Sequence, residues 1–303
     1  MGVQGDNGME ETIIQTIGLS KNYREHKAIE SLSMKINKGD IYGFIGKNGA
    51  GKTTFIRLLT RLINRSSGEI RFDDKKEIKI GAVIEGPACY PYLTAKENLM
   101  YYAIQQNIPN KENRVSEILS FIGLDKTKEK KFKNFSLGMK QRLGIGIAIL
   151  NDPDFLILDE PINGLDPQGV VEVREMINYL RNEKGTTILI SSHILSELSL
   201  SATRYGVIND GKLIKEFSKE QLEKEFNSFL YLRSSDDNEM KRILKHQGYT
   251  YEHLDEGMIV SDISRDQIDE IASLLFNKGI YLVESSYQEE NLEEYYLKLI
   301  SGG

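Results

Sequence analysis

The chain has 303 residues, with 39 Lys and Arg against 45 Asp and Glu, which gives a formal net charge of −6. This balance argues against a nucleic-acid-binding protein, and the single cysteine, Cys89, excludes an internal disulfide and fits a reducing compartment. The first residues lack the basic start of a secretory signal, and the most apolar run, residues 143–150, is too short to span a bilayer. We therefore expect a soluble protein that reaches a membrane only through another chain.

The N-terminal part of the chain alternates between short apolar and polar segments. Residues 1–10 are polar and rich in glycine, and we expect them to be disordered. Residues 20–24 form a polar segment that carries an aromatic, Tyr23, and are predicted to turn. Strands are expected at 12–19, 33–36, 41–45 and 78–84, a turn followed by a strand over 66–72, and a helix over 53–62.

The next part of the sequence has the pattern of helices alone. Thr94 and Glu97 match S/T-x-x-E, the pattern of a capping box that opens a helix. Helices are expected over 94–106 and 114–122, followed by a Lys-rich link over 126–133. We interpret the lysines as a solvated connector, with a binding patch as the alternative. The whole segment, about residues 87–151, is then a helical insert.

Strands and helices alternate again after the insert. Such alternation predicts an α/β fold with a mostly parallel sheet that helices cover on both faces. We therefore expect a nucleotide-binding domain over residues 11–217. Past residue 217 the order β-α-β(β)-α-β-α predicts a small α+β accessory domain over 218–303, of the ferredoxin-like kind. The expected strands are 155–158, 187–190, 204–208, 212–217, 229–232, 258–260 and 280–283, and the expected helices are 168–180, 239–246, 268–276 and 292–300.

A glycine-rich segment joins the predicted strand 41–45 to the predicted helix 53–62. It matches the P-loop pattern G-x-x-x-x-G-K-[ST], in the strand–loop–helix context that a phosphate cradle requires. Glycines let backbone N–H groups approach phosphates, and the helix N-terminus adds its positive dipole. We expect Lys52 to reach the β- and γ-phosphates and the Thr53 hydroxyl to bind Mg²⁺, so ATP and Mg²⁺ are the predicted cofactors. The cofactor-binding residues of this loop are Gly46, Lys47, Asn48, Gly49, Ala50, Gly51, Lys52, Thr53 and Thr54.

Two carboxylates and a histidine stand at the ends of later strands, where ligands bind in an open α/β sheet. Asp159 ends the apolar strand 155–158 and is predicted to hold Mg²⁺. The adjacent Glu160 is predicted to activate the attacking water as a general base. His193 follows a buried strand and is predicted to contact the γ-phosphate. The alternatives are two surface carboxylates at a strand end and a structural or exposed histidine.

A second anion site is expected where another helix begins. Ser136 is placed as the N-cap of a helix, and Gly138 follows two residues later. A helix N-terminus with a hydroxyl and a glycine can bind an anion. One ATP does not need two such cradles within one chain.

Residues 12–217 resemble the ATP-binding cassette family, the nucleotide-binding subunits of ABC transporters. Five motifs occur in the order found in that family. Residues 135–139, Phe-Ser-Leu-Gly-Met, stand where the family has its LSGGQ signature, residues 163–166 resemble its D-loop, and His193 resembles its switch histidine. Tyr23 stands where the family stacks an aromatic on adenine, with a solvent-facing tyrosine as the alternative. The resemblance implies a head-to-tail dimer in which Ser136 and Gly138 of one copy cap the ATP of the other.

One residue departs from the family pattern. The strand 80–84 ends in Glu85, where the family normally has a glutamine that contacts metal and water. Glutamate keeps an oxygen ligand and adds a negative charge beside Mg²⁺ and Glu160, so we place Glu85 among the metal and catalytic residues, with an incidental loop glutamate as the alternative. The segments 83–87, 92–99 and 291–296 are similar to the bacitracin- and lantibiotic-type peptide exporters, whose ATPases carry Glu at this point.

The resemblance implies an ATP hydrolase that powers a separate integral membrane permease. The transported class would be peptide antibiotics or related amphiphiles, which connects the chain to antibiotic resistance. The protein is expected in the cytoplasm, peripheral on the inner face of the cell membrane through the permease, and without a nucleic-acid partner. The alternatives are a regulatory ATP-binding module that senses a membrane partner, and a soluble ABC ATPase without a transport role.

Overall fold

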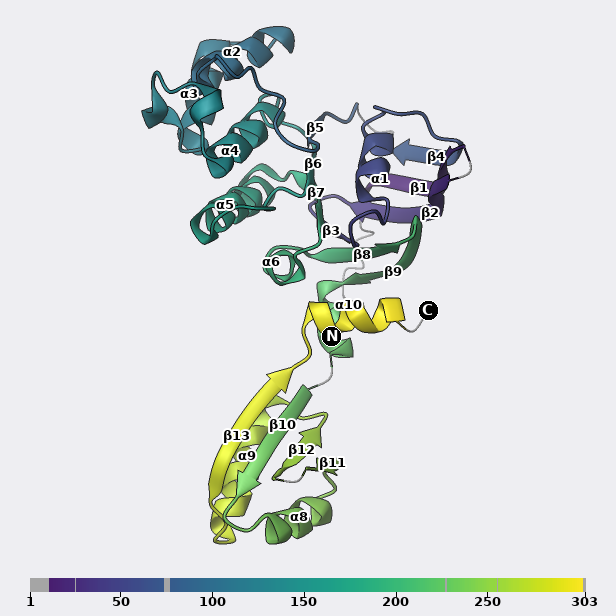
Figure 1. Cartoon of the computed structure of the whole chain (residues 1–303), viewed down its shortest axis with the longest axis vertical. Coiled ribbons are helices and arrows are strands. Elements are labelled where there is room, and N and C mark those ends of the chain that lie inside the picture. Colours follow the sequence, from purple (N-terminus) through teal and green to yellow (C-terminus); the bar gives the residue numbers. More distant parts are fainter. Residues whose placement is uncertain (1–10, 25, 74–76, 227, 255, 302–303) are drawn as a thin grey trace, which may run out of the picture. The chain divides into compact units, whose positions relative to one another are not determined.

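The computed structural model of the chain divides into two compact units, Met1–Lys219 and Glu220–Gly303, which are described separately. The structure describes residues 11–24, 26–73, 77–226, 228–254 and 256–301 (Figure 1). The expectation of disorder for residues 1–10 lies outside the described residues. No helix in the described part of the chain is both long and apolar enough to cross a membrane.

A six-stranded sheet forms the centre of the first unit. Its strand order is β5-β6-β7-β3-β8-β9, and all neighbours are parallel except β8 and β9. All residues of β3, β6 and β7 are buried, because helices cover both faces of this sheet. The strands are β3 (Ile41–Ile45), β5 (Ile80–Val83), β6 (Phe155–Asp159), β7 (Thr187–Ser192), β8 (Arg204–Asn209) and β9 (Lys212–Ser218). The predicted α/β class and the mostly parallel sheet are confirmed.

A second, antiparallel sheet of order β2-β1-β4 packs against the first through a shared apolar core. Its strands are β1 (Thr12–Tyr23), β2 (His26–Asn37) and β4 (Ser67–Phe72). Helix α1 (Lys52–Leu59) lies between the two sheets, where its Phe55 packs on Phe44 of β3 with ring centroids 4.9 Å apart (Figure 1). The predicted turn at residues 20–24 is wrong, because cross-strand pairing with β2 keeps β1 extended as far as Tyr23.

Helices α5 (Pro167–Lys184) and α6 (Leu195–Ser199) cover the face of the six-stranded sheet away from α1 (Figure 1). Helix α5 begins at the N-cap Asp166, whose carboxylate accepts from the N–H of Gly169, and ends at Gly185 in the left-handed conformation. Helix α1 ends three residues before the predicted Leu62. The Thr60 hydroxyl donates to the carbonyl of Ile56 there, and the chain turns away at Arg61 with φ 58°.

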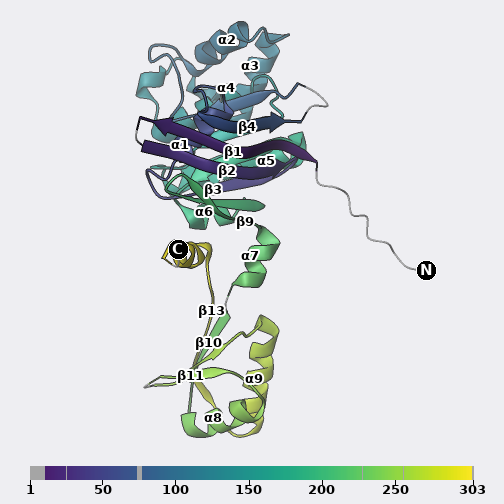
Figure 2. The same ribbon diagram turned by 90° about the vertical axis from the view of Figure 1, so that its right-hand side faces the viewer.

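The helical insert contains α2 (Ala95–Gln105), α3 (Lys111–Phe121) and α4 (Leu137–Ala148), grouped at one side of the unit (Figure 2). The predicted capping box is present: the Thr94 hydroxyl accepts from the N–H of Glu97, and the Glu97 carboxylate accepts from the N–H of Thr94. The latter hydrogen bond lowers the pKa of Glu97. The Lys-rich link contains two short 3₁₀ turns, Asp125–Thr127 and Phe132–Asn134.

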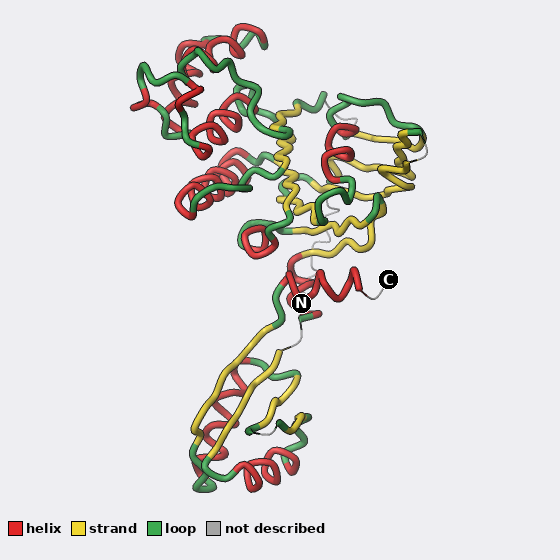
Figure 3. Tube along the Cα trace, viewed as in Figure 1, coloured by secondary structure: helices red, strands yellow, loops and turns green. Residues whose placement is uncertain are grey.

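The second unit is a four-stranded antiparallel sheet with two helices packed on it (Figure 3). The sheet order β11-β12-β10-β13 and the element order are those of a ferredoxin-like fold, as predicted. Inward-facing residues of the sheet, such as Leu230 and Val260, pack with Met240 of α8 and Ile271 of α9 in one apolar core. The elements are α7 (Lys219–Glu225), β10 (Ser228–Ser234), α8 (Asp237–His246), β11 (Tyr251–His253), β12 (Met258–Ser261), α9 (Arg265–Asn277), β13 (Leu282–Glu289) and α10 (Leu292–Ser301).

Candidate nucleotide site

The P-loop connects β3 to α1 in a conformation that only glycine adopts easily. Gly51 has φ 109°, and a Cβ at this position would lie 2.7 Å from the carbonyl oxygen of Ala28. Gly51 is also the N-cap of α1, and it has no side chain that could accept from the first N–H groups of the helix. These N–H donors are therefore available to an anion, which fits the predicted phosphate cradle.

Lys52, the lysine of the P-loop, is 6% exposed. Its Nζ donates to the carbonyl oxygens of Gly46 and Lys47 and lies 3.1 Å from Oε1 of Glu160. The ammonium is thus held over the loop by backbone oxygens and by the carboxylate of the residue that follows β6. Its position at the opening of α1 suits a contact with terminal phosphate oxygens.

Thr53 and Asp159 place two oxygen ligands side by side. The Thr53 hydroxyl donates to Oδ2 of Asp159 over 2.9 Å, and the Ser191 hydroxyl donates to Oδ1 of the same carboxylate. Asp159 and Ser191 are paired residues of the parallel strands β6 and β7, so the sheet fixes this contact. A hydroxyl and a carboxylate fit Mg²⁺, which typically takes few protein ligands and completes its shell with phosphate oxygens and water. In the described ranges, no group of three or more His, Cys, Asp or Glu side chains could hold a metal.

Glu160 contacts both the P-loop lysine, Lys52, and residues at the end of β7. It has φ 51°, in the left-handed region that is strained for a non-glycine residue, and its N–H donates to the hydroxyl of Ser191. Its carboxylate contacts Lys52 with one oxygen and Nδ1 of His193, at 2.8 Å, with the other. The structure thus brings Lys52, Glu160 and His193 together. A carboxylate beside a histidine and a lysine can orient a water molecule and accept its proton.

Glu85 lies elsewhere in this structure. Its carboxylate forms an ion pair of 2.7 Å with Arg57 of α1, whereas the carboxylate of Asp159 is engaged by Thr53 and Ser191. Glu85 and the following Gly86 both have positive φ, 57° and 121°, so the chain turns sharply just after β5. The metal role predicted for Glu85 therefore stays a prediction.

Tyr23 stands at the end of β1, opposite His26 of β2, and its ring is largely exposed. The ammonium of Lys21 lies 4.8 Å from the ring centroid. The ring is therefore accessible for stacking, and the predicted contact with adenine stays a prediction.

Ser136 and Leu137 of the signature segment are exposed, and the segment adjoins the D-loop. The Ser136 hydroxyl caps α4 by accepting from the N–H of Met139, as predicted. A Cβ at Gly164 would lie 3.2 Å from the side chain of Leu137, so the two loops meet there. Ser136, Leu137 and Gly164 are all exposed, and together they form one continuous surface.

Sequence reasoning named three structural partners of the site only in passing or not at all. Ser191 contacts both Asp159 and Glu160 and was not predicted as a site residue. Gly211, in the turn between β8 and β9, donates its N–H to the carbonyl of Ala50 and so holds this turn against the P-loop. Arg57 binds Glu85. Only Ser191 carried a usable signal, because it stands at a strand end two residues before His193, whereas the other contacts join distant segments.

A groove of about 540 Å³ opens beside the end of β5. Its walls are mostly apolar and come from β5, the Gly86–Ala88 loop, α4 and the segment after α1. Tyr102 of α2 stands on its rim, with its hydroxyl bonded to the carbonyl of Ala88. The exposed Tyr101 packs on both Tyr102 and the exposed Tyr90, so these rings continue the apolar surface from the groove.

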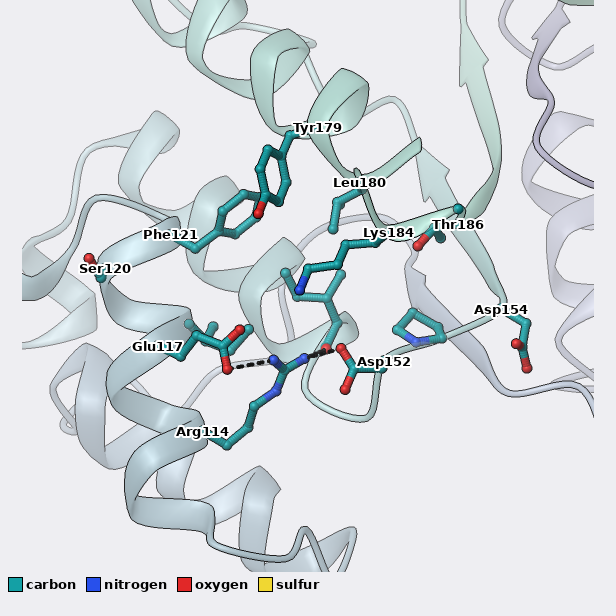
Figure 4. A pocket seen from close by; sticks show the side chains of 14 residues that line it. Arg114, Glu117, Ser120, Phe121, Asp152, Asp154, Tyr179, Leu180, Lys184 and Thr186 are labelled. Atoms are coloured by element: carbon teal, nitrogen blue, oxygen red, sulfur yellow. Dashed lines mark hydrogen bonds and ion pairs between the residues drawn. The ribbon is translucent and has the colours of Figure 1, made fainter. Parts of the chain in front are cut away.

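A larger cavity of about 710 Å³ lies at the opposite, amino ends of β6 and β7 (Figure 4). Arg114 of α3 crosses it and donates to the carbonyls of Ile149 and Leu150 and to the carboxylates of Asp152 and Glu117. The guanidinium thus ties α3 to the connection between α4 and β6. None of the predicted site residues lines this cavity.

Comparisons with known proteins find relatives in sequence and in structure. A family model described as "ABC transporter" matches residues 29–163. The bacitracin transport ATP-binding protein BcrA of Bacillus licheniformis is 42% identical over 302 residues, which cover 96% of this chain and 98% of that protein. The lantibiotic transport ATP-binding protein SrtF of Streptococcus pyogenes is 43% identical over 218 residues, or 69% of this chain and 94% of that protein. The solved structure of cbiO1 from Clostridium perfringens, part of the cbiONQ ABC transporter complex, is 26% identical with a TM-score of 0.64, and the match covers 78% and 96% of the two chains. The similarity to BcrA therefore runs through both units.

Proposed function

The chain belongs to the ATP-binding proteins of ABC transporters, and on that premise we propose that it drives a separate membrane permease that exports peptide antibiotics or related amphiphiles. Members of this family hydrolyse ATP. The observation that carries the proposal is the cluster in which Lys52, Glu160 and His193 meet beside the Thr53–Asp159 pair. The substrate class comes from the names of BcrA and SrtF.

In the proposed reaction, Glu160 is the general base. Thr53 and Asp159 would hold Mg²⁺, which neutralises negative charge on the phosphates when it is bound. Lys52 binds the terminal phosphates, and His193 holds Glu160 on one side. Glu160 then orients a water molecule and takes its proton. Because Lys52 and His193 each contact one carboxylate oxygen, they set the direction in which Glu160 acts.

The working form is a head-to-tail dimer of two copies. This chain contains one P-loop and one signature segment, and both Ser136 and the D-loop residue Gly164 are exposed. A second copy would cover this surface and receive the Ser136 helix start at its own ATP. Closing the dimer on ATP and opening it after hydrolysis is the motion passed to the permease.

The apolar groove beside β5 is the proposed docking place of the permease. Its mostly apolar walls and the exposed rings of Tyr90 and Tyr101, which adjoin Tyr102, offer an apolar surface of the kind that marks an interaction site. A cytoplasmic segment of the permease seated there holds the protein at the inner face of the cell membrane.

The proposal is tested by drug susceptibility. Cells of the source organism that lack this chain should become more sensitive to bacitracin or to a lantibiotic. The wild-type chain should restore resistance, and Glu160→Gln, produced at the same level, should not. Unchanged susceptibility to both classes in the deletion strain would contradict the proposed substrate class.

A further inference from the structure

We propose that Arg57 is a positioning residue for ATP turnover. It holds Glu85 at the last turn of α1, away from the Thr53–Asp159 pair, and releases Glu85 when the groove beside β5 is filled. This inference rests on the proposed function, in which Glu85 acts at the metal. Three observations carry it: the ion pair itself, the arrangement of residues along α1, and the position of the groove.

The ion pair holds Glu85 in a defined place. Nη2 of Arg57 lies 2.7 Å from Oε2 of Glu85, with both side chains partly exposed. Exposed ion pairs contribute little to stability, so this contact can be broken at small cost. The positive φ angles of Glu85 and Gly86 mark a tight turn, and a Cβ at Gly86 would meet no atom within 4 Å. The glycine in this turn is therefore not packed against neighbouring atoms on its Cβ side.

One face of α1 connects the ion pair to the metal-binding residues. Thr53 and Arg57 are four residues apart, so they lie on the same side of the helix, separated by about 6 Å along its axis. Both are half-buried, in contrast to the buried Phe55 and Leu58 of the opposite face. A carboxylate that leaves Arg57 and moves one turn along this face arrives beside Thr53 and Asp159.

The groove is lined by residues close in sequence to each partner of the ion pair. Ile84 and Gly86, the two neighbours of Glu85, line the groove, and so do Thr60 and Leu62, just beyond the end of α1. Thr60 also continues the half-buried face of α1 past Arg57. A segment that enters the groove therefore contacts residues adjacent to both Glu85 and the end of α1 that carries Arg57. This links occupation of the groove to the position of Glu85.

The test compares Arg57→Gln with Arg65→Gln, an exposed arginine for which the structure shows no contact with Glu85, in the full chain. Mn²⁺ replaces Mg²⁺, and its affinity is measured by electron paramagnetic resonance with a non-hydrolysable ATP analogue. Arg57→Gln should raise Mn²⁺ affinity and the basal ATPase rate by about two- to five-fold, the range that an exposed ion pair allows. Arg57→Lys, which keeps the ion pair, and Arg65→Gln should both behave like wild type.

The role of Glu85 is separated by a second set of variants. Glu85→Gln should lower Mn²⁺ affinity, and Arg57→Gln added to it should have no further effect. If Glu85→Gln lowers the affinity but Arg57→Gln changes neither affinity nor rate, the inference is overturned while the proposed role of Glu85 stands. If Glu85→Gln leaves Mn²⁺ affinity unchanged, the metal role of Glu85 is wrong and the inference falls with it.

Discussion

The two units of the chain distribute their charge in opposite ways. Residues 220–303 contain 18 of the 45 acidic residues but 8 of the 39 basic ones, so this unit carries −10 and the remainder of the chain carries +4. In the first unit, Asp159 is buried and Glu160 half-buried, and each is held by specific partners. In the second unit nearly all described carboxylates are exposed, with Glu290 as a buried exception.

The first unit contains the candidate nucleotide site, whereas the second unit is described by its fold alone. Charged groups drawn into strand ends must be paired, because an unpaired buried charge is costly. The pairs around Asp159 and Glu160 are therefore the price of a reactive site. The second unit leaves nearly all its described carboxylates exposed around an apolar core, and its buried Glu290 is paired with Lys298 at 2.7 Å.

The largest effect is expected from Glu160→Gln in the first unit. Loss of the general base should lower kcat for ATP by at least about 100-fold, while ATP still binds. With Mg-ATP the variant should accumulate as a dimer, measured by size-exclusion chromatography with light scattering. Glu270→Gln, an exposed acid of α9 in the second unit, should leave kcat unchanged. A variant of Glu160 that stays monomeric with Mg-ATP would contradict the proposed dimer.

A core substitution in the second unit should lower the stability of that unit and leave nucleotide binding unchanged. Met240 is fully buried in the apolar core, and Met240→Ala should cost about 2–5 kcal/mol of the free energy of unfolding of this unit. Affinity for a fluorescent ATP analogue should stay at the wild-type value, because the P-loop belongs to the other unit. Leu297→Ala, at an exposed position of α10, is the control. Loss of nucleotide affinity in Met240→Ala would show that the two units are coupled.

Arg114→Gln sharpens the comparison within the first unit, where polar contacts also support the fold. The change leaves the carbonyls of Ile149 and Leu150 without their guanidinium donor and should cost about 1–3 kcal/mol in urea unfolding. Arg242→Gln, in the second unit, removes an arginine that is 80% exposed and should cost less than about 0.5 kcal/mol. Equal losses for the two variants would contradict this difference.

The smallest effect concerns a carboxylate at the edge of the first unit. Burial raises the pKa of Glu216 above 4.5, and the Tyr42 hydroxyl donates to its Oε1 over 2.7 Å. Because the folded chain holds this proton more tightly than the unfolded chain, Glu216 stabilises the fold most below pH 4.5, and this stabilisation is lost as pH rises through the raised pKa. Glu216→Gln should therefore show a smaller decline of unfolding free energy between pH 4.5 and neutrality than wild type. An identical pH profile in urea titrations would disprove this role.

Local signals in the sequence were sufficient for much of the fold. The P-loop, the caps at Thr94 and Ser136 and the element order of the second unit were predicted from neighbouring residues. Each of these features is encoded within a few positions: glycine where the backbone must take a positive φ, a hydroxyl where a helix begins, an apolar run where a strand is buried. The strand-end position of Asp159 also followed from such a run.

Tertiary structure decided the features that join distant segments. Ser191 reaches Asp159 because β6 and β7 are neighbours in the sheet, and β1 stays extended to Tyr23 because β2 pairs with it. Glu85 has the same short sequence context whether it faces the metal ligands or Arg57, and only the approach of the segment after β5 to α1 places it on Arg57. The sequence by itself thus predicted the groups of the candidate nucleotide site. Contacts between strands and helices far apart in the chain decided how those groups are paired, because such pairing depends on sheet order and helix packing rather than on neighbouring residues.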